Sequence, residues 1–235
     1  MIEIVKELNS KYSVADRITE VLGELVERFG ELVFTTSFGL EDQVVTDLIM
    51  KSEKKKQIKF ATLDTGRLFA ETYKTMSKTQ QQYGISIKTY FPDNEQVENM
   101  VDEKGMFSFY ESMDNRKECC KIRKVVGLGR ALEGNKIWIT GLRTEQSQAR
   151  SELRLFEWDE GFSIIKYNPI LSFSWAETLE YVKNCNVPYN VLHDKGFVSI
   201  GCEPCTRALK EGEDFRSGRW WWESGSKKEC GLHSS

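Results

Sequence analysis

Four short apolar stretches, separated by helix-like segments, restrict the fold of this chain more than any other feature. They are ELVFTT (31–36), IKFATLD (58–64), ISIKTYF (85–91) and KIWITG (136–141). β-Branched and aromatic residues are frequent in them, as is typical of strands. Strands that alternate with helices form a mostly parallel sheet covered by helices on both faces. The sequence therefore predicts an α/β fold with such a sheet.

Helix signals support this prediction at both ends of the chain. Apolar residues recur at helical spacing between Val14 and Phe29, and Gly30 is expected to end that helix. Ser174 and Glu177 form a capping box that is expected to begin another helix. Beyond Gly212 the residues are rich in Gly, Ser, Arg and Trp. We therefore expect an α/β domain over 1–211 and a mobile C-terminal segment over 212–235.

The segments that follow the four strands share a polar and glycine-rich character. They are TSFGLEDQ (36–43), LDTGR (63–67), FPDN (91–94) and GLRTEQSQAR (141–150). Ligands of parallel sheets bind at the carboxyl ends of the strands. Backbone N–H groups approach phosphate where glycine permits it, and arginine binds phosphate or sulfate through two hydrogen bonds. The sequence thus predicts an anion site at this edge of the sheet.

The overall charge excludes some classes of partner. The chain has 33 basic and 36 acidic residues, for a net charge of −3. No global positive field draws it to nucleic acid or to an anionic membrane, so any bound anion needs a local cluster of cations. The N-terminus has no apolar signal region, and no apolar run approaches the roughly 18 residues of a membrane span. We expect a cytoplasmic protein that binds neither nucleic acid nor membrane.

The cysteines fall into two pairs and two single residues. Reducing conditions in the cytosol disfavour structural disulfides, which leaves metal binding or thiol chemistry. The two pairs together supply four soft ligands, which suit either zinc or a [4Fe–4S] cluster. Adjacent cysteines are unusual in zinc sites, which favours the cluster. Taken alone, each pair is about as compatible with a role other than metal binding: a redox pair or a chance spacing for Cys202 and Cys205, and a buried pair of small side chains for Cys119 and Cys120. The pairs are Cys119 with Cys120 and Cys202 with Cys205, and the single residues are Cys185 and Cys230.

Six motifs together resemble one enzyme family. TSFGLEDQ, LDTGRLFAETY, CCKIRK, GLRTEQSQAR, SIGCEPCTRALKEGEDFRSGRWWWE and ECGLH occur in the order and spacing of the assimilatory adenylyl-sulfate (APS) and phosphoadenylyl-sulfate (PAPS) reductases. The resemblance extends from about residue 33 to 233 and implies an adenine nucleotide α-hydrolase-like (PP-loop) fold. It departs from the family at Ala70, where proline is usual, and at Thr144, where a basic residue is common. Neither residue touches the proposed chemistry.

The resemblance also implies a cofactor, a substrate and a reductant. All four cysteines of the cluster-containing branch are present, which implies a [4Fe–4S] cluster on Cys119, Cys120, Cys202 and Cys205. That branch implies APS as substrate, with PAPS or dual use as the alternative. In the family mechanism Cys230 attacks the sulfate sulfur, AMP leaves, and thioredoxin releases sulfite from the cysteine adduct. Because thioredoxin supplies both electrons, we expect the cluster to act electrostatically through Lys124 without redox cycling.

Substrate-binding candidates come from the sheet edge and the tail. Asp64 and Thr65 are equally compatible with ribose binding and with helix capping. His233 is assigned to the substrate by resemblance, whereas His193 is expected to be structural, Cys185 to lie in the core, and Trp220 and its two neighbours to pack the tail onto the sheet. The full set of predicted substrate-binding residues is Ser37, Gly39, Asp64, Thr65, Gly66, Arg67, Lys124, Arg143, Arg216, Arg219 and His233.

Two other functions compete with this prediction. A PP-loop enzyme that thiolates tRNA predicts an ATP-binding S-G-G-x-D-S loop and a basic face, whereas TSFGLEDQ lacks that loop and the net charge is −3. A binding module with structural zinc predicts a colourless protein and leaves Cys230 unexplained. Relatives are commonly homo-oligomers, so a homo-oligomer is expected, with thioredoxin as a separate protein.

Overall fold

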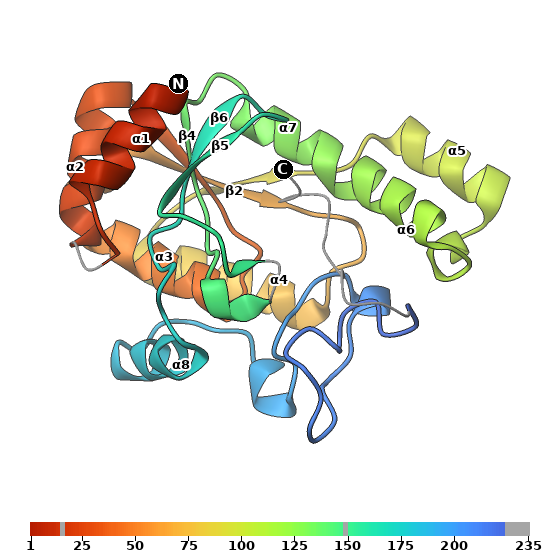
Figure 1. Cartoon of the computed structure of the whole chain (residues 1–235). Coiled ribbons are helices and arrows are strands. Elements are labelled where there is room, and N and C mark those ends of the chain that lie inside the picture. The colour runs from red at the N-terminus through yellow and green to blue at the C-terminus, as the bar shows by residue number, and fades with distance from the viewer. Residues whose placement is uncertain (15–16, 148–149, 224–235) are drawn as a thin grey trace.

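The computed structural model describes residues 1–14, 17–147 and 150–223, and its centre is a six-stranded sheet (Figure 1). The strand order is β3-β2-β1-β4-β6-β5, and all neighbouring strands are parallel except β5 and β6. The first four strands confirm the prediction, whereas the antiparallel β5–β6 hairpin was not predicted. The strands are β1 (Leu32–Thr35), β2 (Ile58–Leu63), β3 (Ile87–Tyr90), β4 (Ile137–Ile139), β5 (Phe156–Asp159) and β6 (Ile164–Tyr167).

Helices cover both faces of the sheet, as predicted. Figure 1 shows α6 and α7 in line above the sheet and α3 and α4 below it. The π-helical turn Lys121–Val125 joins α6 to α7. No described helix is both long and apolar enough to cross a membrane. The helices are α1 (Ile2–Lys11), α2 (Ile18–Phe29), α3 (Leu40–Lys51), α4 (Ala70–Tyr83), α5 (Asn94–Lys104), α6 (Met113–Cys120), α7 (Val126–Leu132) and α8 (Trp175–Asn184).

The predicted helix boundaries hold where a backbone or side-chain signal specifies them. Gly30 ends α2 with a φ of 80°, a conformation that glycine adopts without steric cost. Ser174 and Glu177 form the predicted capping box at the start of α8. The helix expected from Val14 begins instead at Ile18, and the side chain of Val14 is exposed.

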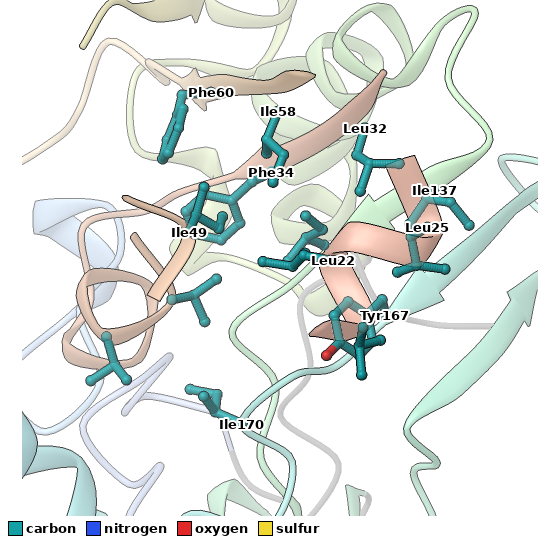
Figure 2. Close-up of a cluster of buried hydrophobic side chains, with 14 of the residues drawn as sticks. Leu22, Leu25, Leu32, Phe34, Ile49, Ile58, Phe60, Ile137, Tyr167 and Ile170 are labelled. Atoms are coloured by element: carbon teal, nitrogen blue, oxygen red, sulfur yellow. The ribbon is translucent and has the colours of Figure 1, made fainter. Parts of the chain in front are cut away.

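Alternation along the strands divides the core between the two faces of the sheet. Leu32 and Phe34 of β1 pack into the larger cluster, together with residues of α2, α3 and α8 (Figure 2). Val33 points to the other face and packs with Trp138 and Leu128. Because successive side chains of a strand face opposite sides, both faces of β1 are buried, as expected for a strand inside a parallel sheet.

A third buried cluster holds the C-terminal part of the described chain against α5 and α6. Trp220 is 1% exposed and packs with Phe109 and three cysteines. Thr206 forms an isolated β-bridge with Arg219, and the Arg207 N–H donates to the Gly218 carbonyl at 2.9 Å. The described part of the predicted C-terminal segment, 212–223, is therefore packed against the α/β domain. Residues 224–235 lie outside the described part.

Candidate functional site

A cavity of about 200 Å³ opens at the carboxyl edge of the sheet, where the sequence predicted an anion site. Thr36, Ser37 and Gly39 line it from the loop between β1 and α3. Gly39 is the N-cap of α3, so the free N–H groups of that helix begin here. Phe38 has a φ of 60° and a side chain that is only 1% exposed. A bulky residue with a positive φ is energetically unfavourable, and such backbone conformations occur most often at functional sites.

Asp42 holds the loop that contains Ser37 in place. Its Oδ2 accepts hydrogen bonds from the Ser37 N–H at 2.6 Å and from the Ser37 hydroxyl at 2.8 Å. Burial raises the pKa of the Asp42 carboxyl to about 6. Gly141 leaves the room that this carboxyl needs, because a Cβ there would lie 2.3 Å from Asp42 Oδ1. Ser37 therefore has a fixed orientation at the cavity wall.

Four cationic side chains line the same cavity: Lys124, Arg150, Arg216 and Arg219. Three of them are buried, with exposed fractions of 9% for Lys124, 9% for Arg150 and 6% for Arg219. The predicted Lys124, Arg216 and Arg219 thus come together, although they come from distant parts of the sequence. Arg150 was not singled out, although it ends the GLRTEQSQAR motif after β4. Buried cations around a cavity favour an anionic ligand.

Arg143 differs from its prediction, because it does not line this cavity. Its side chain is fully buried and donates to Glu41 Oε1 at 2.8 Å through Nη2 and at 3.1 Å through Nε. Nη1 donates to Glu145 and to the Phe173 carbonyl, both at 2.9 Å. The guanidinium is engaged by protein acceptors, and through Glu41 Arg143 braces the start of α3.

The LDTGR loop lies between this cavity and a second one. Thr65 lines the first cavity, and Arg67 lines the second. Asp64 and Gly66 line neither; Asp64 accepts the Gly66 N–H at 2.8 Å and the Tyr73 hydroxyl at 2.9 Å. Asp64 therefore stabilises the loop and does not cap α4, whose N-cap is Phe69.

The second cavity is lined by all four paired cysteines. Cys119 and Cys120 end α6, and Cys202 and Cys205 flank the short helical turn Glu203–Cys205. Each cysteine is at most 8% exposed. Burial raises the pKa of the Cys205 thiol to about 12 and also raises that of Cys119. With these raised pKa values, the Cys119 and Cys205 thiols are protonated at neutral pH.

The thiols are not arranged around a single point. Among the described residues, no three His, Cys, Asp or Glu side chains are placed to hold one metal ion. A tetrahedral zinc site requires four ligands that converge within about 2.3 Å of one centre. All four cysteines nevertheless line one small buried cavity.

Buried N–H groups around the thiols lack acceptors. Within the described chain no hydrogen-bond partner exists for Arg67 Nη1, Arg123 Nε, Arg219 Nε, Trp220 Nε1 or Trp222 Nε1. The first four belong to residues that line the thiol cavity, and Trp222 packs beside it. Buried donors are nearly always satisfied, so these atoms point to an absent acceptor. Burial, followed by the charge of Arg123, lowers the pKa of Arg67, as expected where positive charge is uncompensated.

Lys124 and Arg219 line both cavities and so connect them. Lys124 belongs to the π-helical turn that directly follows Cys120. Arg219 precedes Trp220, and Gly201 allows its close approach: a Cβ there would lie 2.3 Å from Arg219 Nη2. An anion in the first cavity and a buried acceptor group in the second would therefore share the same two cations.

Two predicted residues, Cys230 and His233, lie outside the described residues. Their attachment point is nevertheless fixed, because Glu223 forms a buried ion pair with Arg116 at 2.7 and 3.0 Å. Cys230 follows Glu223 by seven residues in the sequence.

Three secondary predictions have mixed outcomes. Trp220 packs into the molecule as expected, and Cys185 packs partly buried against the main core. His193 was expected to be structural, and its Nδ1 does lie 2.7 Å from the Phe197 carbonyl. However, His193 also lines the anion cavity, and its buried Nε2 has no partner among the described residues.

Comparisons with known proteins agree with this geometry. Residues 31–208 match the family model described as phosphoadenosine phosphosulfate reductase domain. The chain is 44% identical to the adenosine 5'-phosphosulfate reductase of Allochromatium vinosum, over 91% of this chain and 83% of that relative. It is 44% identical to the enzyme of the same name from Neisseria meningitidis serogroup A, over 97% and 94%, and 47% identical to that of Rhizobium meliloti, over 87% and 76%.

Solved structures show a similar fold. A phosphate complex of the PAPS reductase of Candida auris has a TM-score of 0.73 and 31% identity, over 87% of this chain and 97% of that one. The FMN adenylyltransferase of Candida glabrata has a TM-score of 0.58 over 99% of this chain and 85% of that one. At 14% identity the second likeness concerns the fold alone.

Proposed function

The chain belongs to the phosphoadenosine phosphosulfate reductase family, and we propose that it reduces adenylyl sulfate to sulfite and AMP. Curated relatives at 44–47% identity are named for the reduction of adenosine 5'-phosphosulfate, the same compound. One observation carries the proposal. The cation-lined cavity at the sheet edge shares Lys124 and Arg219 with the buried four-thiol cavity.

The cavity suits the two ends of this substrate. Leu63, Leu128 and Trp138 give it an apolar part next to the strand ends, where an adenine ring would find contacts. Lys124, Arg150, Arg216 and Arg219 supply the charge that the phosphate and sulfate oxygens require. We assign the Ser37–Gly39 loop to the phosphate, because it places a hydroxyl and the first N–H groups of α3 at the wall.

The reaction that we propose is a nucleophilic substitution at sulfur. The thiolate of Cys230 attacks the sulfate sulfur, the S–O bond to the phosphate breaks, and AMP leaves with the bond's electron pair. A thioredoxin thiolate then attacks the Cys230 sulfur and expels sulfite, and the second thioredoxin thiol releases Cys230 from the mixed disulfide. The thioredoxin dithiol supplies both electrons. Lys124, Arg216 and Arg219 neutralise the oxygens, so that an anionic nucleophile can approach.

We propose that Cys119, Cys120, Cys202 and Cys205 hold a [4Fe–4S] cluster. The orphaned N–H donors of Arg67, Arg123, Arg219 and Trp220 support this, because cluster sulfides and thiolates are the acceptors that they lack. When bound, the cluster supplies a buried negative charge, which the cations next to it offset. Lys124 and Arg219, which line both cavities, would hold the substrate anion while they stay positively charged.

Metal content tests the cofactor directly. Protein purified without oxygen is expected to be brown and to contain about four iron and four sulfide per chain, as a four-thiolate cluster requires. Elemental analysis and sulfide determination measure both quantities. Stoichiometric zinc without iron would contradict the cluster and would favour the zinc-binding module as the alternative function.

Substrate choice tests the reaction. With thioredoxin as reductant, sulfite release from APS is expected to have a kcat/KM at least about tenfold above that from PAPS, because the 3′-phosphate must find a cation of its own or leave its charge uncompensated. The assay compares the two nucleotides at matched concentrations. Equal efficiencies would replace the narrower proposal by dual APS and PAPS use, and a preference for PAPS would contradict it.

A further inference from the structure

Four exposed apolar side chains form a continuous patch beside the four-thiol cavity. They are Met106, Phe107, Tyr110 and Trp221, which are 52%, 61%, 38% and 47% exposed. The rings of Phe107 and Tyr110 lie 6.2 Å apart, and those of Tyr110 and Trp221 lie 6.4 Å apart. We refer to these four residues as the aromatic patch. A contiguous exposed patch of large apolar residues commonly marks an interaction site.

The aromatic patch rests on the same elements that hold the cysteines. The Tyr110 hydroxyl donates to the Pro204 carbonyl at 2.6 Å, between Cys202 and Cys205. Arg67, which lines the thiol cavity, donates through Nη2 to the Met106 carbonyl at 2.6 Å. Tyr110 also contacts Trp222, with ring centroids 4.4 Å apart. The patch therefore has a fixed position relative to the reaction site.

The described part of the chain leaves the aromatic patch exposed. Trp221 belongs to the patch, and Cys230 follows Trp221 by nine residues in the sequence. The patch and the proposed nucleophile are therefore close together along the chain.

We propose that the aromatic patch is the docking surface for the dithiol protein that releases sulfite from Cys230. This inference rests on the proposed function, which requires a thioredoxin thiolate to reach the Cys230 sulfur, expel sulfite and leave as a disulfide. Aromatic and methionine side chains are enriched at the centres of protein interfaces, where a few of them carry most of the affinity. Trp221 of the patch is two residues before Glu223, the last described residue. A reductant bound to the patch would therefore lie next to the start of the segment that contains Cys230.

Phe107→Glu tests the docking surface, since Phe107 is the most exposed residue of the aromatic patch. Burying a charge at an interface centre is costly, so the KM for thioredoxin is expected to rise at least about tenfold. Phe91→Glu is the matched control, because Phe91 is 58% exposed and the whole of α5 separates it from the patch in the sequence. It is expected to keep the wild-type KM. Phe107→Ser should act in the same direction with a smaller effect.

Two further measurements separate failure of this inference from failure of the proposed function. Without reductant, wild type and both glutamate variants should form the Cys230 adduct equally, and a small dithiol should release sulfite equally from all three. An unchanged thioredoxin KM in Phe107→Glu would overturn the docking surface, as would a change in self-association without a change in that KM. If wild type forms no adduct, the proposed function fails and the docking inference falls with it.

Discussion

Replacing Cys230 with serine is expected to lower sulfite release at least about a thousandfold, because a serine hydroxyl, unlike a cysteine thiol, does not ionise appreciably near neutral pH. The four paired cysteines lie in a separate buried cavity, so the Cys230→Ser protein should keep its iron and sulfide. Thioredoxin-dependent sulfite release measures the first expectation, and elemental analysis together with the visible absorption spectrum measures the second.

Cys185→Ser is the matched control for this variant. Cys185 is partly buried against the main core and lines neither cavity. We expect it to keep wild-type turnover, because it has no place in the proposed reaction. Turnover that survives in Cys230→Ser, or that is lost equally in both variants, would contradict the role of Cys230 as the nucleophile.

Removing Glu223 is expected to lower the free energy of unfolding by about 3 kcal/mol, because it leaves the buried charge of Arg116 without its carboxylate. The two side chains are only 3% and 9% exposed, and they form two hydrogen bonds at 2.7 and 3.0 Å. In the variant, the Arg116 guanidinium would still stack on the Trp220 ring, whose centroid lies 4.6 Å from the guanidinium carbon. This cation–π contact offsets part of the loss of stability. Because this pair ties the end of α6 to the chain just before Cys230, Glu223→Ala should also release iron faster. Anaerobic urea unfolding and iron release to a chelator measure the two effects.

Glu118→Ala provides the comparison on the same helix. Glu118 pairs with Lys104 at 2.6 Å, but the two side chains are 39% and 36% exposed. Exposed ion pairs contribute roughly 0 to 1 kcal/mol, so this variant should unfold within that range of wild type. Similar small effects for Glu118→Ala and Glu223→Ala would show that the buried pair does not anchor the C-terminal segment.

The sheet was predictable because its signals are local. The runs of β-branched and aromatic residues at β1 to β4, Gly30 after α2 and the Ser174 capping box each lie within a few residues of the structure that they specify. The position of the anion cavity followed from the same pattern, since polar loops after parallel strands must meet at one edge. Grouping the cysteines into two pairs also located the second cavity, as all four line it.

The differences arise where a distant partner decides the role of a residue. Arg143 was expected to bind the anion, but Glu41, far away in the sequence, takes its guanidinium once the loops after β1 and β4 meet. Arg150 was passed over for the opposite reason: its place at the cavity depends on the path of the loop after β4. Neither pairing leaves a periodic or spacing signal. The orphaned N–H groups around the thiols are likewise visible only in three dimensions.

The central claim is that Cys230 carries the sulfur of adenylyl sulfate between two half-reactions. The most direct measurement mixes the reduced protein with APS in the absence of any reductant and follows both AMP and the mass of the Cys230 peptide. We predict one AMP per chain and one added SO₃ group on Cys230, which thioredoxin then removes as sulfite. Release of AMP with Cys230 unmodified, or with the SO₃ group on another residue, would contradict it.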